Sequence, residues 1–189
     1  MGGNYLEVVE KFKLLGVIIR SDLKWSDTDY ICQKGYSRLW ILRRLRGLGA
    51  DILEMVDVYE KQVRPVLEMA VPVWQPALTQ QESTQIERVQ RCALYIILGE
   101  KYKSYEEALE ILKFKTLEER REKLCENFAK KALKHQKYKN WFSLNEKQHK
   151  FNTRNKDKIN KFNPVRSRTD RYRKSSLSNL TDMLNRIHG

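Results

Sequence analysis

Apolar residues recur at the spacing of an α-helix between residues 31 and 138, and this periodicity constrains the fold more than any other feature. Three hydroxyl residues, each followed three positions later by Glu, precede apolar runs, where such a pair caps the first turn of a helix. Glycines follow two of the runs, where helices commonly end. The pairs are Thr79/Glu82, Ser104/Glu107 and Thr116/Glu119, and the glycines are Gly47, Gly49 and Gly99. Residues 27–142 are therefore predicted to form about five helices.

Four of these helices have an apolar stripe that should face a shared core. Pro65 lies inside the second stripe, and a kink is expected there because proline lacks an N–H and crowds the preceding turn. The stripes are Ile31, Leu39, Leu42 and Leu45; Ile52, Met55, Val56, Tyr59, Val63, Val66 and Leu67; Ile86, Val89, Ala93, Ile96 and Ile97; and Leu117, Leu124, Phe128 and Ala132.

The first 26 residues favour β-structure. Two runs rich in β-branched residues, 5–9 and 12–20, are separated by Glu10 and Lys11, and they predict a hairpin. Gly16 lies inside the second run, where a glycine indicates a bulge or the close approach of another backbone.

Positive charge is concentrated in the last quarter of the chain. The formal net charge is +13, of which residues 1–142 contribute +5 and residues 143–189 contribute +8. The end of the folded unit is predicted near Ser143. Residues 143–189 are expected to form a basic, partly disordered extension with a short terminal helix, marked by Leu177, Leu180, Met183, Leu184 and Ile187. Such a charge balance favours a polyanionic partner. The predicted fold is thus mainly α, with an N-terminal β-hairpin, about five helices and this extension.

Three stretches carry a family resemblance: FKLLGVIIRSDLKW (12–25), VRPVLEMAVPVW (63–74) and ERVQRCALYIILG (87–99). In this order and spacing they resemble the region after the catalytic palm in reverse transcriptases of non-LTR (LINE-type) retrotransposons, nearest to the Jockey and CR1 branches. The resemblance extends from about residue 5 to the C-terminus. It implies that the chain is the primer-grip, thumb and post-thumb part of such an RNA-directed DNA polymerase. It also implies that Leu14, Leu15 and Gly16 belong to the primer grip, where glycine lets a sugar-phosphate come close; a plain hairpin covering the base of the helices is the alternative.

The sequence does not contain the catalytic centre that the family uses. Polymerases of this kind hold two metal ions on carboxylates, partly from an aromatic-Ala-Asp-Asp turn, and no Asp-Asp pair occurs in the 189 residues. We therefore expect no enzymatic activity from this chain alone and no cofactor, although the parent enzyme would use Mg²⁺. The cysteines, Cys32, Cys92 and Cys125, are too far apart for a zinc knuckle and are expected to be thiols in a reducing compartment.

Two groups of residues are predicted to bind nucleic acid, as duplex or single strand. The arginines of the first helix lie largely off its apolar stripe, where guanidinium groups can contact phosphates; a solvated helix face, partly neutralised by Asp51, Glu54 and Asp57, is the alternative. The tail interleaves basic and aromatic residues, which suit phosphates and bases respectively, and is expected to contribute more of the binding. The candidates are Arg38, Arg43, Arg44 and Arg46 in the helix, and Lys156, Lys161, Arg166, Arg168, Arg171, Tyr172, Arg173 and Lys174 in the tail.

Two further functions remain open. The chain is either a domesticated, sequence-nonspecific nucleic-acid-binding module, or a helical interaction domain. In the second case its exposed hairpin, at residues 17–19 and Trp25, would bind a separate palm domain or another protein. Salt-sensitive binding of nucleic acid would favour the first function. The N-terminus lacks the features of a signal peptide, and no apolar run reaches transmembrane length, so an intracellular protein, nuclear or cytoplasmic, is expected.

Overall fold

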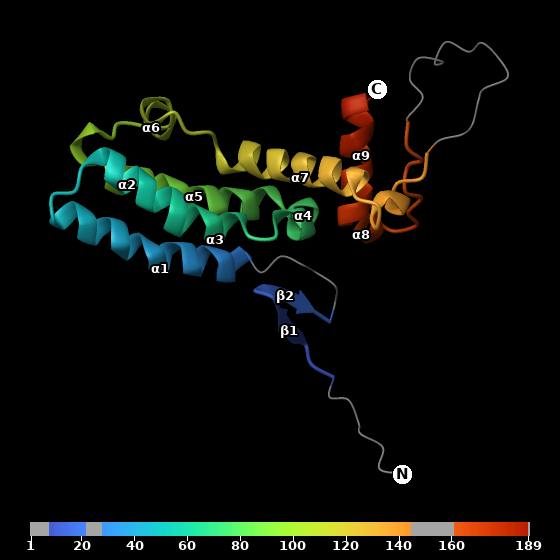
Figure 1. The fold of residues 1–189 in the computed structure, drawn as a ribbon. Coiled ribbons are helices and arrows are strands. Elements are labelled where there is room, and N and C mark those ends of the chain that lie inside the picture. Colours follow the sequence, from blue (N-terminus) through green and yellow to red (C-terminus); the bar gives the residue numbers. More distant parts are fainter. Residues whose placement is uncertain (1–7, 22–27, 145–160, 189) are drawn as a thin grey trace. The chain divides into compact units, whose positions relative to one another are not determined.

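The computed structural model describes residues 8–21, 28–144 and 161–188, with only the backbone described at Arg171 and His188. The described chain is mainly α-helical and begins with an antiparallel β-hairpin, as predicted (Figure 1). It divides into two compact units. The first comprises residues 1–70 and 77–108, and the second comprises residues 71–76 and 109–189.

The hairpin is formed by the run that was predicted to be its second strand, residues 12–20, together with Lys11. Strand β1 (Lys11–Leu14) pairs with β2 (Val17–Arg20), and Leu14 lies opposite Val17. The two residues between them, Leu15 and Gly16, have φ angles of 48° and 87°. Positive φ at both positions is what a two-residue hairpin turn of type I′ requires. Gly16 is therefore a turn residue and not a bulge. Val8 and Val9 precede the first strand, and residues 5–7 lie outside the described residues.

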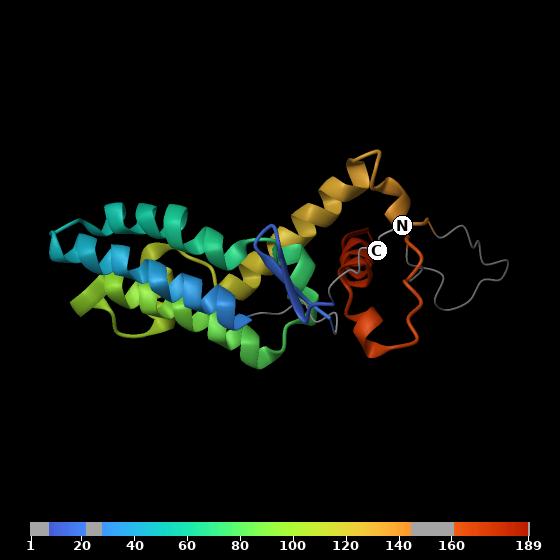
Figure 2. The same ribbon diagram turned by 90° about the horizontal axis from the view of Figure 1, so that it is seen from below.

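Three helical segments lie side by side in the first unit (Figures 1 and 2). They are α1 (Thr28–Gly47), the segment from α2 (Ile52–Val58) through a π-helical turn (Tyr59–Val63) into α3 (Arg64–Glu68), and α5 (Gln80–Leu98). A 3₁₀ turn (Gly99–Lys101) leads from α5 to α6 (Tyr105–Leu112). The predicted stripes form the core, with these residues buried: Leu39, Leu42, Met55, Tyr59, Val63, Leu67, Ile86, Val89, Ala93, Ile96 and Ile97.

Gly35 allows α1 to pack closely against its two neighbours. A Cβ atom at Gly35 would lie 2.7 Å from Leu67 Cδ2 and 2.9 Å from Val89 Cγ1. Glycine inside a helix costs about 1 kcal/mol relative to alanine, but here any side chain would push α1 away from α3 and α5. Helices α1 and α5 run in the same direction, because Gly35 meets Val89 near the middle of both helices and Arg46 meets Ile96 late in both.

The predicted irregularity at Pro65 takes the form of the π-helical turn. The Arg64 N–H donates to the carbonyl of Tyr59, five residues back, immediately before the proline. The wider turn also directs the Tyr59 side chain into the core, where its hydroxyl donates to Gln90 Oε1 at 2.6 Å. Gln90 Nε2 donates to the Tyr105 hydroxyl at 2.9 Å, and that hydroxyl donates to Glu87. Burial raises the pKa of both tyrosines, so they remain neutral hydrogen-bonding groups.

The predicted helix caps are present. The Thr79/Glu82 pair forms both bonds of a capping box, and the hydroxyls of Ser104 and Thr116 accept from the backbone N–H groups of Glu107 and Glu119. A second complete capping box, Asp51/Glu54, begins α2. These two acidic side chains, which the sequence suggested as partners for the arginines of the first helix, therefore cap their own helix.

The second unit joins α4 (Val71–Trp74), α7 (Leu117–Lys134), α8 (Asp170–Arg173) and α9 (Ser176–His188), with 3₁₀ turns at Gln75–Ala77 and Lys139–Trp141. Helix α9 packs against α7 and α4, and in Figure 1 it runs across the C-terminal end of α7. The Ser176 hydroxyl donates to the Val73 carbonyl at 2.9 Å. The terminal helix predicted from the sequence is thus part of a folded core.

This packing changes the predicted domain boundaries, which lay after residues 26 and 142. Residues 109–142 group with the C-terminal segment, and so does α4. The connection is partly through backbone pairing: Leu144 and Phe162 form an antiparallel bridge, and the Asn163 N–H donates to the Ser143 carbonyl at 2.9 Å. Phe162 is buried and makes an edge contact with Phe142. Residues 145–160, part of the predicted disordered extension, lie outside the described residues.

The buried face of α7 differs from the predicted stripe. Leu117 and Ala132 are buried as expected, whereas Phe128 is exposed and Leu124 is half-buried. In their place the structure buries three residues that continue from Leu117 at four-residue steps, namely Arg121, Cys125 and Ala129. Arg121 Nε donates to Gln75 Oε1 at 2.8 Å. The whole side chain is buried, so its guanidinium is held by polar contacts inside the unit and does not reach solvent.

Asn185 should contribute strongly to the stability of the second unit. Its side chain accepts from the Phe162 N–H at 2.9 Å and donates to the Phe162 carbonyl at 3.1 Å, and both residues are buried. Replacing Asn185 with Leu removes both bonds, and loss of a buried partner costs roughly 1–3 kcal/mol per group. We expect denaturant unfolding to show a loss of about 2–4 kcal/mol. The exposed Asp182→Asn on the same helix should change stability by less than about 0.5 kcal/mol; equal effects would contradict this role.

Candidate nucleic-acid interface

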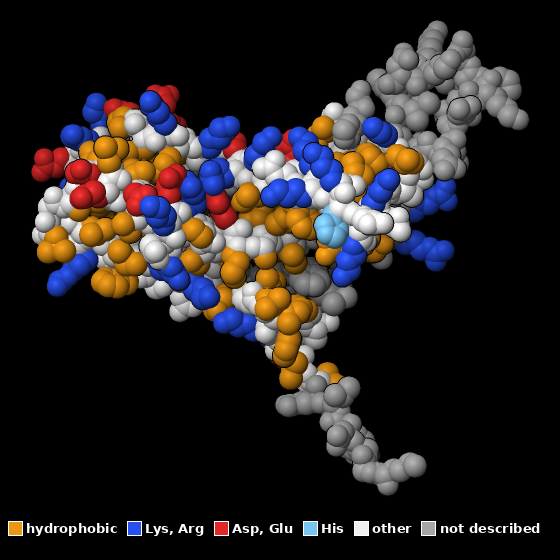
Figure 3. Space-filling view, in the orientation of Figure 1, with side chains coloured by type: hydrophobic (Ala, Val, Ile, Leu, Met, Phe, Trp, Pro, Cys, Tyr) orange, Lys and Arg blue, Asp and Glu red, His pale blue; other side chains and the backbone are white. Residues whose placement is uncertain are grey.

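A basic face runs along two helices of the first unit, with Glu100 at its edge. Residues 30–47 and 88–99 contain no Asp or Glu, and they lie on α1 and α5, which pack side by side. Their basic residues are Lys34, Arg38, Arg43, Arg44, Arg46, Arg88 and Arg91. In Figure 3 the red acidic side chains gather over α2 and α6, whereas α1 carries blue and orange ones. We call the exposed surface of α1 and α5 the arginine face.

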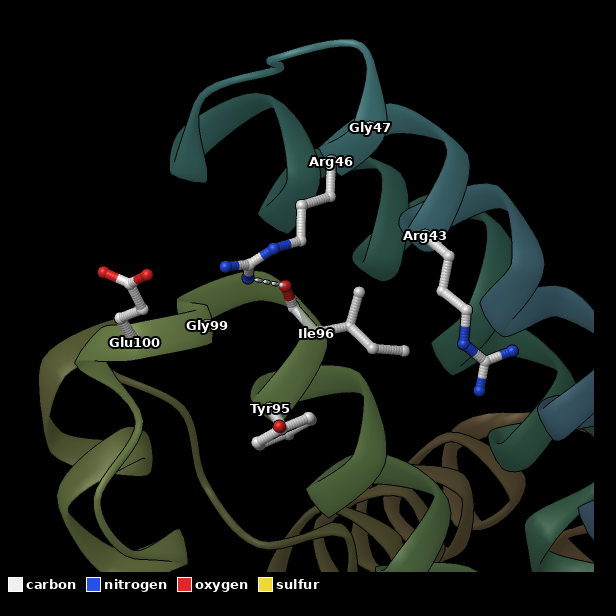
Figure 4. A pocket seen from close by; sticks show the side chains of 7 residues that line it. All are labelled: Arg43, Arg46, Gly47, Tyr95, Ile96, Gly99 and Glu100. Carbon is white, nitrogen blue, oxygen red and sulfur yellow. Dashed lines mark hydrogen bonds between the residues drawn. The ribbon is translucent and has the colours of Figure 1, made fainter.

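Arg46 and Arg38, both predicted to bind nucleic acid, make hydrogen bonds within the fold. Arg46 Nη1 donates to the Ile96 carbonyl at 2.6 Å (Figure 4). This contact places a positive charge at the C-terminal end of α5. There it satisfies a carbonyl and interacts favourably with the negative end of the helix dipole. Arg38 Nη1 donates to the Gln62 carbonyl at 2.9 Å, within the irregular turn before Pro65. Both guanidinium groups therefore join α1 to its neighbours.

The side chains of Arg43 and Arg44 are exposed and make no hydrogen bond or ion pair with the other residues that the structure describes. Arg43 extends from α1 beside α5 (Figure 4) and lines two open hollows. The larger, of about 650 Å³, is lined by Arg43, Arg46, Gly47, Tyr95, Ile96, Gly99 and Glu100. The smaller, of about 350 Å³, is lined by Arg43, Arg91, Cys92, Tyr95, Ile96 and Tyr102.

Helix α5 adds two arginines that were not among the predicted site residues. Arg88 and Arg91 are exposed, and the Arg91 guanidinium lies 5.0 Å from the centre of the Tyr105 ring. Both arginines lie off the apolar stripe of this helix, next to buried Val89. Sequence reasoning could have found them by the criterion that selected Arg43 and Arg44.

Aromatic residues lie between these arginines, and the sequence analysis did not select them either. Trp40 and Tyr95 are each 60% exposed, and Tyr36 is 41% exposed. Burial raises the pKa of Tyr36, with further increases from Cys92 and Cys32, whereas the Arg88 guanidinium lowers it. Tyr36 on α1 is therefore close to the α5 residues Arg88 and Cys92. The arginine face thus combines positive charge with exposed aromatic rings.

The hairpin turn at Leu14, Leu15 and Gly16 has no free space beside its glycine. A Cβ atom on Gly16 would lie 2.6 Å from Met69 Cε, so the close approach here involves a side chain of the same unit. Leu14 and Leu15 are exposed, together with Val8, Val9 and Phe12, and hydrophobic side chains gather over the hairpin in Figure 3. Residues 17–19, predicted to form the exposed apolar surface, are half-buried, and Trp25 lies outside the described residues.

The predicted binding residues of the tail belong to the second unit. Lys161, Arg166, Arg168, Tyr172 and Lys174 are exposed. Arg173 forms an ion pair with Asp170 at 2.8 Å. Arg171 lies in α8, where only its backbone is described, and Lys156 lies outside the described residues.

All three cysteines are described and none forms a disulfide; Cys32 and Cys125 are buried. Within the described ranges no group of three or more His, Cys, Asp or Glu side chains is arranged to hold a metal ion. No helix in the part of the chain described is long and apolar enough to span a membrane.

Comparisons of the chain with protein-family models, with curated proteins and with solved structures find no match. The resemblance to LINE-type reverse transcriptases therefore stays a prediction from the three sequence stretches.

Gly99 should be required for the contact between Arg46 and α5. Its φ is +56°, and a Cβ atom there would lie 1.6 Å from Arg46 Nη2. Gly99→Ala should therefore cost about 2–3 kcal/mol of unfolding free energy, from backbone strain and displacement of the guanidinium. Gly49→Ala is the matched control, because Gly49 has a φ of +81° and open space around its Cβ position; it should cost about 1 kcal/mol.

A double-mutant cycle measures how much of this stability loss comes from the collision between a Cβ atom at position 99 and the Arg46 guanidinium. Removing the guanidinium with Arg46→Ala relieves the collision, so Gly99→Ala/Arg46→Ala should be about 1 kcal/mol more stable than the sum of the single effects predicts. Strict additivity would show that the two residues do not interact.

Proposed function

We propose that this chain is a nucleic-acid-binding module that contacts the phosphate backbone through the arginine face of α1 and α5. The family resemblance leads to the same proposal, because the thumb of a reverse transcriptase holds its template and primer. We propose that the chain derives from such a thumb and lacks polymerase activity by itself.

The observation that carries this proposal is the gathering of arginines from two neighbouring helices, on segments 30–47 and 88–99 that contain no carboxylate, with Glu100 at the edge of the surface. Elsewhere in the first unit, lysines and acids neutralise each other, as in the pairs Lys61–Asp57 and Lys103–Glu107. Arg43, Arg88 and Arg91 are exposed and have no such acidic partner among the described residues. Guanidinium groups suit phosphate oxygens because they present several donors in a fixed plane.

We assign the principal interface to the arginine face and a supporting role to the basic tail. The arginine face is carried by helices that a buried core fixes in place, so little backbone conformational entropy is lost when phosphates bind. In the tail, Arg173 is already paired with Asp170. The exposed apolar hairpin supports a second function, docking of another protein, because Phe12, Leu14 and Leu15 are each at least half exposed.

The charge test compares two triple variants of the full chain with equal loss of charge. Arg43→Gln/Arg88→Gln/Arg91→Gln removes the arginine face, and Lys61→Gln/Lys103→Gln/Lys123→Gln removes lysines that pair with nearby acids. Binding to a labelled nucleic acid is measured by fluorescence anisotropy at several salt concentrations. The slope of log affinity against log salt should fall by about 3 in the arginine variant, and much less in the lysine control.

Equal losses in both variants would mean that only the total charge matters. A salt-independent association of the wild-type chain would favour protein docking at the hairpin instead. The contribution of the tail is measured with substitutions such as Arg166→Gln and Arg168→Gln, because truncation would also remove α9 from the core of the second unit.

A further inference from the structure

The arginine face presents aromatic rings in positions that a purely electrostatic contact does not need. Trp40 and Tyr95 each leave 60% of their surface exposed, although aromatic side chains strongly favour burial. Both lie next to arginines. An exposed apolar surface that is surrounded by charge is typical of a site for a ligand with both apolar and anionic parts.

The rings and arginines form two neighbouring rows. On α1, Tyr36, Trp40 and Arg44 follow one another at four-residue steps, which places them on one side of the helix. On α5, Arg88, Arg91 and Tyr95 follow at steps of three and four. The rows adjoin, because Tyr36 is close to Arg88 and because Arg43 lines the smaller hollow together with Arg91 and Tyr95.

The smaller hollow can take a flat aromatic group. Its volume is about 350 Å³, and its wall includes the apolar groups of Cys92, Ile96 and the Tyr95 and Tyr102 rings. Tyr95 and Tyr102 make an edge-to-face contact, with ring centres 5.4 Å apart and planes at 81°, which restrains the Tyr95 ring. Arg43 and Arg91 add two cationic groups to the same wall, within reach of a phosphate attached to the flat group.

From this arrangement we infer that the arginine face binds single-stranded nucleic acid, with unpaired bases stacked on Tyr95 and Trp40 and the phosphates held by Arg43, Arg88 and Arg91. The inference deepens the proposed function and rests on it. A duplex keeps its bases stacked on one another and offers only phosphates and groove edges to a surface, so it leaves the rings unused. A single strand can place a base in the hollow, and stacking on aromatic side chains tolerates any base.

The test compares two ligands and two aromatic variants. Fluorescence anisotropy measures the affinity of the full chain for a labelled oligothymidylate and for a blunt DNA duplex of the same length. Trp40→Leu/Tyr95→Leu removes the rings and keeps apolar bulk. Each stacked base contributes about 1–3 kcal/mol, so this variant should bind the single strand at least tenfold more weakly, while duplex affinity should change less than about twofold.

Trp141→Leu is the matched control, because Trp141 is an exposed aromatic residue of the second unit; it should leave both affinities unchanged. Circular dichroism and melting temperature check that each variant is folded, and a destabilised double variant is replaced by Tyr95→Leu alone. The triple variant Arg43→Gln/Arg88→Gln/Arg91→Gln should bind both ligands more weakly.

The possible outcomes separate this inference from the proposed function. Equal loss of single-strand and duplex binding in the aromatic variant, or no loss of either, would overturn base stacking and leave phosphate binding in place. If the wild-type chain bound the duplex but not the single strand, base stacking would also be overturned. No binding of either ligand at low salt would defeat the proposed function itself.

Discussion

The close approach of α1 to α5 is the constraint on which the first unit depends. Gly35 permits it, because any larger side chain would meet Leu67 and Val89. The parallel direction of the two helices then brings their outer arginines and aromatic rings onto one surface. Near the other end of the contact, Arg46 binds a carbonyl of α5. The core and the candidate interface are therefore two consequences of the same helix packing.

Arginine has two distinct uses in this fold, and position relative to the core separates them. Arg38 and Arg46 bind backbone carbonyls of neighbouring elements, and Arg121 is buried against Gln75 in the second unit. Arg43 and Arg88 instead point to solvent. A high arginine content is thus partly structural, and net charge alone overstates the surface available to a polyanion.

Much of the fold followed from local sequence signals. The helical stripes, the caps at Thr79 and Thr116 and the glycine stops act over a few residues, so periodicity was sufficient to find them. The hairpin turn was missed because Leu15 adopts a positive φ, which leucine rarely does. The folded tail was missed because Asn185 and Phe162 are 23 residues apart, and no local pattern encodes such a contact.

The candidate interface likewise could be predicted only in part, because no local sequence pattern encodes which helices are neighbours. Arg43 and Arg44 were found from their places off a stripe, and Arg88 and Arg91 would have been found in the same way. That α1 and α5 are close neighbours depends on tertiary packing, including the close contact at Gly35. Sequence periodicity identifies the outer face of each helix, but it does not reveal which outer faces adjoin.

The chain order of the two units has a consequence for modularity. The backbone passes from one unit to the other three times, at residues 70/71, 76/77 and 108/109. A cut after residue 108 would leave α4, with its Trp74, attached to the first unit and separated from α7 and α9. Neither unit can thus be exchanged, deleted or inherited as one continuous segment. Recombination would preserve both units only if it moved them together.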